Sequence, residues 1–151
     1  IGLSIYDFNN IHENIKKFKF DVIQCPFNIF DQRLVVEKHL QKFKKKRVKV
    51  HVRSIFLQGL LLNQNFKEKK KFQKWKIELD EYFGFLNKKR LKAIDLCLNF
   101  VLRFKKIDKI IVGINSKKHL NDIFKYKKYR FDKYNLFNHS DKKDLIDPRK
   151  W

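Results

Sequence analysis

The sequence predicts an α/β fold built on a parallel sheet. Short runs rich in Val, Ile and Phe alternate along the chain with segments in which apolar residues recur at helical spacing. The chain has 151 residues, of which 43% are hydrophobic, so it can fill the core of one domain. Because parallel neighbours cannot be joined by a tight turn, the alternation favours a sheet with helical crossovers.

Four runs have the composition of buried strands, with Val, Ile or Phe concentrated in a few positions. They are residues 2–6 (GLSIY), 21–27 (DVIQCPF), 49–56 (KVHVRSIF) and 109–115 (KIIVGIN). The third run continues to residue 62 and forms the longest nearly uncharged apolar stretch of the chain. A single charged residue, Arg53, interrupts it after its first strand residues.

Segments with helical periodicity fill the intervals between these runs. Their apolar positions are Ile11, Ile15 and Phe18, then Val36, Leu40 and Phe43, then Ile94, Cys97, Leu98, Val101 and Leu102, and last Leu120, Ile123 and Phe124. Asp31 is expected to cap the second helix, and Asn115 or Ser116 the last one.

Two segments depart from the repeating pattern. A lysine-rich insertion, residues 63–90, carries Trp75, Leu79, Tyr82, Phe83 and Leu86, and predicts an additional helix whose end Gly84 weakens. After Tyr129 the periodicity decays, so residues 130–151 are expected to form a C-terminal tail over the surface, held by Leu145, Ile146 and Trp151.

The number of units bears on the architecture. A complete (β/α)8 barrel takes about 250 residues, or roughly 30 for each unit. Four units and one insertion in this length match half of such a barrel. A doubly wound open sheet has the same order of elements, but its glycine-rich turn after the first strand is absent from IGLSIYDFNN.

The strong positive charge suggests a second class of function. Lys and Arg number 37 against 16 Asp and Glu, which gives a net charge of +21. A non-catalytic basic α/β module that binds nucleic acid or an acidic partner is therefore an alternative. The charge is spread along the chain rather than gathered in one motif, and Lys, Asn, Ile and Phe all have A/T-rich codons. We therefore interpret the lysines as surface residues rather than as a nucleic-acid-binding patch.

Composition also bears on location. Residues 49–62 are too short for a bilayer, which requires about 20 apolar residues, and the opening residues have no features of a signal peptide. Cys25 and Cys97 lie among apolar neighbours without metal-ligand spacing. We expect reduced thiols and a cytoplasmic protein.

The chain contains no Met and opens directly on a strand pattern, so we expect it to be part of a longer protein.

Polar side chains recur where the predicted strands end. They are Ser4, Gln24, Arg53 with Ser54, and Asn115 with Ser116. Parallel α/β folds bind ligands at the carboxyl ends of strands, so this set suits a polar ligand with carboxamide and phosphate groups. Each also has a structural explanation: a core hydroxyl for Ser4, a polar barrel layer for Gln24, and a helix cap for the last pair.

Four motifs resemble a known family. GLSIYD, DVIQCPFNIFDQR, VHVRSIFLQGLLL and IDKIIVGINSKKHLNDI resemble, in this order, the last four βα units of an aldo/keto reductase, and the closing DLIDPRKW resembles the tail of a bacterial branch of that family. The resemblance implies a TIM barrel that binds NADP(H), or less often NAD(H), and reduces small-molecule carbonyl substrates by hydride transfer. It makes this chain the C-terminal half of the barrel.

The resemblance also implies roles for residues of the first three units. Ser4 and Gln24 match the side chains that bond the nicotinamide carboxamide. Arg53 occupies the position where most members place an aromatic residue on the nicotinamide ring, and a planar guanidinium can also stack there. The loop that surrounds the pyrophosphate is matched by Ser54, Phe56, Leu57 and Gln58, with Gly59 allowing the turn.

In the last unit the resemblance places the adenosine end of the cofactor. Gly113 and Asn115 match positions that meet the 2′-phosphate or ribose, and Lys117 and Lys118 add charge nearby. The anion would face the positive end of the helix that follows. Two further cofactor positions are expected, His119 where a glutamine is common and Asp122 near the adenine.

No catalytic residue is expected in this half. The family's Asp, Tyr, Lys and His tetrad belongs to the first half of the barrel, so the partner of this chain is the missing N-terminal half. His51 is predicted to be a half-buried strand residue. We expect the acidic cluster of the insertion to be a solvated helix face and the other histidines to bind no metal. These residues are Glu78, Asp80, Glu81, His12, His39 and His139.

Overall fold

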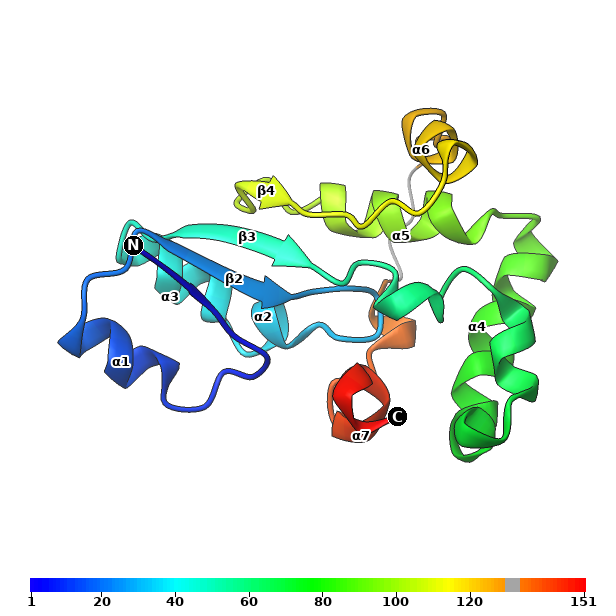
Figure 1. Ribbon diagram of the computed structural model, residues 1–151, viewed down its shortest axis with the longest axis horizontal. Coiled ribbons are helices and arrows are strands. Elements are labelled where there is room, and N and C mark those ends of the chain that lie inside the picture. The colour runs from blue at the N-terminus through cyan, green and yellow to red at the C-terminus, as the bar shows by residue number, and fades with distance from the viewer. Residues whose placement is uncertain (130–133) are drawn as a thin grey trace.

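Four parallel strands form one sheet in the computed structural model, which describes residues 1–129 and 134–151 (Figure 1). The strands are β1 (Gly2–Ser4), β2 (Val22–Pro26), β3 (Lys49–Arg53) and β4 (Lys109–Ile110), in the order β1-β2-β3-β4. This confirms the predicted α/β class. Each strand is shorter than its predicted run at the carboxyl end, because there the chain leaves the ladder and turns into a loop.

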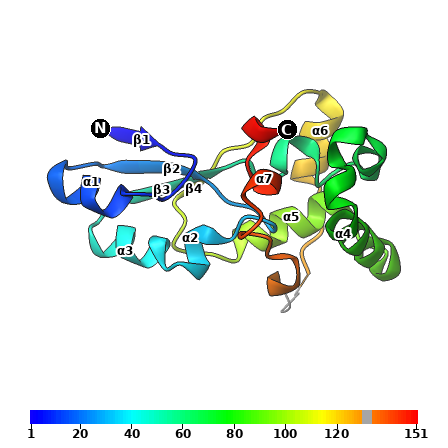
Figure 2. The same ribbon diagram turned by 90° about the horizontal axis from the view of Figure 1, so that it is seen from below.

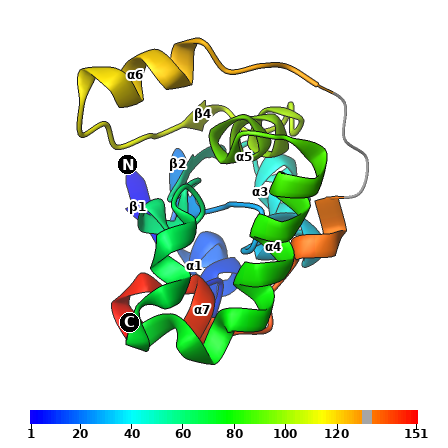
Figure 3. The same cartoon turned by 90° about the vertical axis from the view of Figure 1, so that its right-hand side faces the viewer.

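Helices connect the strands or follow the last one, and some of them cover one face of the sheet. They are α1 (Ile11–Lys17), α2 (Arg33–Val36), α3 (His39–Lys45), α4 (Lys76–Lys89), α5 (Ala93–Leu102), α6 (Lys117–Phe124) and α7 (Lys143–Ile146). Short 3-10 turns cover Leu57–Gly59, Gln64–Glu68, Lys70–Trp75, Tyr134–Phe137 and Pro148–Lys150. Figures 2 and 3 show α1, α3 and α5 on the same side of the strands.

The core lies between the sheet and these helices. Along β3, Val50 and Val52 are fully buried, whereas His51 between them is only half-buried, as predicted. Successive strand residues point to opposite faces, so the face away from the helices carries His51 in register with Gln24 and Ser4. Four parallel strands covered on one face match half of a (β/α)8 barrel, with β1 and β4 as edge strands.

Two details of the predicted helices are wrong. The second helix is broken at Lys38, which has a φ of 59°, so α2 ends before α3 begins and Val36 is 54% exposed. Its N-cap is Gln32, not Asp31. Asp31 is instead buried and forms an ion pair with Arg33 at 2.7 Å.

The sequence predicted the N-cap of α6 correctly, but not the exposure of two apolar residues at the ends of α1 and α6. Ser116 caps α6 as expected, because its Oγ accepts a hydrogen bond of 3.1 Å from the His119 N–H. Phe18 does not face the core: α1 ends at Lys17, and the Phe18 side chain is 61% exposed. Phe124, at the end of α6, is also exposed.

The insertion packs its apolar side against the core. Two 3-10 turns lead into α4, and the predicted apolar residues Trp75, Leu79, Tyr82, Phe83 and Leu86 are buried. The helix does not end at Gly84, because α4 continues to Lys89. Packing of the buried side stabilises the helix beyond what local propensity provides.

Most of the C-terminal tail docks onto the insertion and the sheet. Residues 130–133 lie outside the described residues, but Leu145 and Ile146 are buried further on. The prediction that Glu78 is solvated is wrong, because its buried carboxylate forms an ion pair with Lys142 of the tail. Burial by itself raises the pKa of Glu78, but the hydrogen bond from Lys142, a backbone hydrogen bond and the nearby positive charge together lower the pKa overall.

Both cysteines are buried free thiols, as the sequence predicted. Burial raises the pKa of Cys25 and of Cys97 to about 12, so neither thiol ionises near neutral pH. Among the helices of the described residues, none has the length and apolar content needed to cross a membrane.

Gly84→Ala is expected to stabilise the protein. Gly84 lies inside α4, and a Cβ built there meets no atom within 4 Å. Replacing Gly by Ala inside a helix contributes about 1 kcal/mol, which for a chain of this size raises the melting temperature by about 3 °C. Thermal unfolding followed by circular dichroism at one protein concentration measures this. An unchanged or lower melting temperature would contradict the packing described for α4.

The isolated chain is expected to self-associate. Both edge strands expose unpaired backbone groups, and no helix of the described residues covers the open face of the sheet, so a second copy can pair with either. Size-exclusion chromatography with light scattering over a range of concentrations measures the mass. A compact monomer at every concentration would count against an incomplete barrel.

Candidate functional site

The predicted ligand residues gather at one end of the sheet. In Figure 1 the arrows of β2 and β3 point toward the loops that follow them and toward the C-terminal segment. The parallel register pairs Pro26 with Arg53, so the loops after β2 and β3 begin side by side. The register of β1 with β2 pairs Ser4 with Gln24, which lies two residues before Pro26.

Two cavities open at this end. The first, which we call the loop cavity, has a volume of about 430 Å³ and lies between the loops after β3 and β4. The second, which we call the tail cavity, has a volume of about 270 Å³ and lies between the strand ends and residues 146–151. Both are lined by Arg53, Ser54 and Gln58. These three residues therefore form the boundary between the cavities.

Neutral groups hold the guanidinium of Arg53. Its Nη2 donates to the carbonyl of Ile5 and its Nη1 to Oγ of Ser54, both at 3.1 Å, and its Cζ lies 4.2 Å from the centroid of the Tyr6 ring. Within residues 1–129 and 134–151, no carboxylate pairs with Arg53. Its positive charge is therefore uncompensated at the boundary of the two cavities.

The loop after β3 has an unusual backbone. Ser54, Leu57 and Gln58 have positive φ angles of 59°, 46° and 53°, and Gly59 follows at 83°. Such conformations cost about 1 kcal/mol or more for residues other than Gly, and they persist where the surrounding structure fixes them. Here the buried side chains of Ile55 and Leu57 anchor the loop in the core.

The same loop offers backbone donors. The N–H groups of Ser54, Ile55 and Phe56 make no hydrogen bond to any part of the chain that the structure describes. Consecutive free N–H groups in a tight turn form a concavity that suits an anion such as a phosphate. The Leu57 N–H is different, because it donates to the Ser54 carbonyl at 2.9 Å.

Asn28, in the segment directly after β2, fixes this loop, a role that the sequence did not predict. Its side chain is fully buried, and its Nδ2 donates to the carbonyl of Ser54 at 3.1 Å. Its Oδ1 accepts from the N–H groups of Phe30 and Asp31, each at 2.9 Å. The signal was present, because Asn28 is the one strongly polar residue in the apolar run CPFNIF directly after β2.

The structure brings Ser4 and Gln24 together on the open face of the sheet. The Ser4 Oγ donates to Oε1 of Gln24 at 3.3 Å. The Gln24 Nε2 makes no hydrogen bond within the described ranges of the chain. Neither residue lines the loop cavity or the tail cavity. They lie on the strands that lead to the cavities, on the face that also carries His51.

The predicted residues of the last unit divide into two groups. Gly113, Asn115 and His119 line the loop cavity opposite Phe56. The Nε2 of His119 is buried without a hydrogen-bond partner in the described residues, and its ring centroid lies 5.6 Å from that of Phe56. Asp122 is half-buried on α6 and lines neither of the two cavities, and Leu57 points into the core.

A histidine pair lies elsewhere, between α1 and α3. The Nε2 of His12 is 2.6 Å from Nδ1 of His39, whose Nε2 is 2.7 Å from the Glu37 carboxylate. Burial lowers the pKa of both histidines, and Glu37 opposes the shift at His39. No group of three or more potential metal ligands occurs in the described residues. The pair therefore fills the helix interface, where the His39 ring also stacks on Phe8.

Comparison with known proteins assigns the chain to one family. The model of the Aldo/keto reductase family matches residues 1–142, which is nearly the whole chain. A search of curated proteins found no significant match. The family match agrees with the four parallel βα units and with the resemblance of their motifs. The chain belongs to the aldo/keto reductase family, whose members are oxidoreductases.

Proposed function

We propose that this chain forms the cofactor-binding half of an NADP(H)-dependent, or less often NAD(H)-dependent, reductase of small-molecule carbonyl compounds. The loop cavity carries this proposal. It combines the uncompensated charge of Arg53, the free N–H groups of residues 54–56 and the unpaired Nε2 of His119. A ligand with phosphate groups satisfies all three, and a cavity of this size suits part of a dinucleotide.

The phosphates of the cofactor have suitable donors on both walls of the loop cavity. On one wall the free N–H groups of residues 54–56 and the hydroxyl of Ser54 offer hydrogen bonds. On the other wall Gly113 and Asn115 precede α6, whose N-terminus carries a partial positive charge. Lys117 and Lys118 in its first turn are exposed and favour the extra 2′-phosphate of NADP.

The nicotinamide end of the cofactor fits the polar side chains on the strands beside Arg53. A carboxamide needs both a donor and an acceptor, and the Gln24 side chain provides both, with the hydroxyl of Ser4 at 3.3 Å fixing its orientation. The planar guanidinium of Arg53 offers a stacking surface. A bound nicotinamide supplies the hydride for carbonyl reduction. The residues of this chain hold and orient that ring.

The remaining parts of the enzyme are assigned to an N-terminal half barrel. That half would supply the catalytic tetrad, including a tyrosine that protonates the carbonyl oxygen. It would pair with the edge strands and cover the open face that carries Ser4, Gln24 and His51. The free, buried Cys25 and Cys97 support a reducing, cytoplasmic setting.

Arg53→Ala is expected to weaken NADPH binding about tenfold or more. The substitution removes a charged donor and a stacking surface, and the loss of one hydrogen bond to a charged group costs about 1.5–3 kcal/mol. Isothermal titration of NADPH into the full-length protein measures this. Lys89→Ala is the matched control, because it removes one positive charge from the exposed last turn of α4. Equal affinities for both variants would remove Arg53 from the cofactor site.

The alternative function, a basic module that binds nucleic acid, predicts different binding measurements for the same protein. A nucleic-acid-binding function requires affinity for DNA or RNA that falls steeply as the salt concentration rises. If the wild-type protein shows that behaviour and no measurable binding of NADPH, the reductase proposal fails. We expect NADPH binding in the micromolar range, with only weak and non-specific attraction of nucleic acid.

A further inference from the structure

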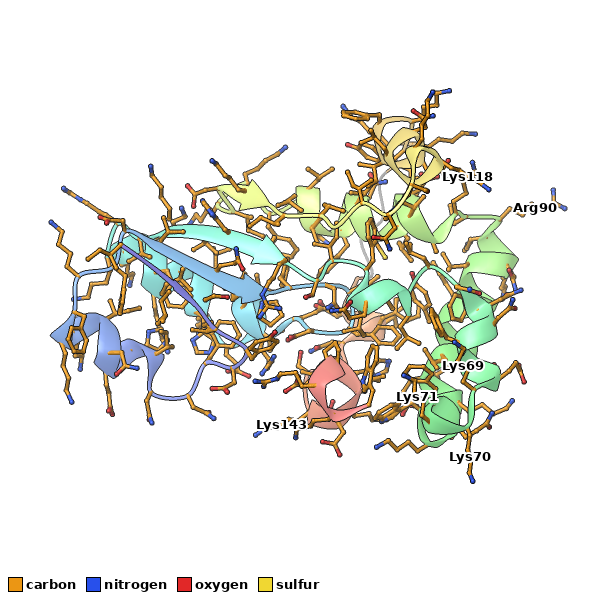
Figure 4. The ribbon with its side chains drawn as sticks, viewed as in Figure 1. Lys69, Lys70, Lys71, Arg90, Lys118 and Lys143 are labelled. Carbon is orange, nitrogen blue, oxygen red and sulfur yellow. The ribbon has the colours of Figure 1, made fainter. Side chains whose placement is uncertain are left out.

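The tail cavity joins three parts of the chain that are distant in sequence. Tyr6 comes from the end of the first unit, Lys71 from the insertion, and Arg149 and Trp151 from the C-terminal segment. Figure 4 shows Lys71 beside the C-terminal segment, whereas the neighbouring Lys70 points away from it. The C-terminal part of the lining, residues 146–151, lies outside the residues 1–142 that the family model matches, and it takes no part in the proposed cofactor site.

Positive charge dominates the lining of the tail cavity. Three cationic side chains, Arg53, Lys71 and Arg149, face one carboxylate, Asp147. Asp147 accepts hydrogen bonds of 2.8 Å from Nε and 2.6 Å from Nη2 of Arg149, so this pair is already neutral. Lys71 and Arg53 have no carboxylate partner among the described residues. Two positive charges therefore remain for an anion to compensate.

The Tyr6 ring positions the two guanidinium groups. The Cζ of Arg149 lies 3.8 Å from the ring centroid, and that of Arg53 lies 4.2 Å from it. Asp147 binds the Nε and Nη2 atoms of Arg149, which leaves its Nη1 without a partner in the described part of the chain. The cavity thus contains one guanidinium edge that is held in place and free to donate.

Trp151 adds a fixed apolar wall. Its Nε1 donates to the carbonyls of Asp144 and Leu145, each at 3.1 Å, and Phe72 packs edge-on against its ring at 5.0 Å. The Lys71 Nζ lies 5.9 Å from the centroid of this ring. A cation beside an immobilised aromatic surface suits a small organic molecule with an anionic group at one end.

We infer that the tail cavity is a substrate subsite for carbonyl compounds that carry a carboxylate or a phosphate. Arg149 and Lys71 bind the anionic group, and Trp151 contacts the carbon skeleton. Arg53 lines both cavities and so lies between the bound anion and the cofactor site. The inference names the substrate class of the reductase proposed above and rests on that proposal. The volume of about 270 Å³ limits the substrate to a small molecule.

The test compares charged and neutral aldehydes of nearly equal shape. The full-length protein is saturated with NADP⁺, and binding of 4-carboxybenzaldehyde and 4-carbamoylbenzaldehyde is measured by isothermal titration. Glyceraldehyde 3-phosphate and glyceraldehyde form the second pair and distinguish phosphate from carboxylate. We expect the charged member of at least one pair to bind ten times more tightly or better, as one charge-assisted hydrogen bond provides. No preference in either pair would overturn the inference.

Two variants locate the anionic group. Arg149→Gln and Lys71→Gln are each expected to reduce the preference for the charged aldehyde about tenfold and to leave affinity for the neutral aldehyde unchanged. Lys70→Gln is the matched control, because this adjacent lysine does not line the cavity. Equal losses for charged and neutral aldehydes would indicate a purely structural role for Arg149 and Lys71, and would contradict the subsite.

Titration of NADPH alone separates this inference from the proposed function. Unchanged NADPH affinity in Arg149→Gln, together with a lost preference for the charged aldehyde, supports both. If the charged aldehyde competes with NADPH, the tail cavity binds a cofactor phosphate instead and the substrate subsite is wrong. If NADPH does not bind the wild-type protein, the reductase proposal itself fails, and the subsite fails with it.

Discussion

The parallel pairing of β2 with β3 is the constraint on which the candidate site depends. It places Pro26 beside Arg53, so two loops leave the sheet at one end, and it places Gln24 beside His51 on the open face. A shift of one residue would turn Arg53 toward the helices and bury an unpaired charge in the core. The alternation of buried Val50 and Val52 with the more polar positions prevents that shift.

The loop after β3 supplies the backbone donors of the proposed cofactor site. Its backbone adopts three positive φ angles at residues other than Gly, and a relaxed loop would satisfy its own N–H groups instead of leaving them free. Asn28 and the buried Leu57 hold the strained conformation from two directions. Packing of the core thus keeps these N–H groups free for the anion of the proposed cofactor.

The C-terminal segment lines the tail cavity from outside the sheet. The Lys142–Glu78 ion pair and the buried Leu145 tie it to the insertion and the core, and Asp147 then orients Arg149 over the Tyr6 ring. The large surplus of lysine on this protein is spread widely and carries little chemical information by itself. A cationic side chain indicates a candidate binding site where it lines a cavity and has no carboxylate partner.

The four βα units, most apolar sides of the helices and the family motifs could be predicted from the sequence alone, because periodicity and composition are properties of neighbouring residues. Which polar groups meet depends on the tertiary structure. The Gln32 N–H bonds the Ser140 Oγ 108 residues away, and Arg53 and Arg149 share one aromatic ring. Such contacts depend on strand register and on how the tail docks, and no local pattern encodes either.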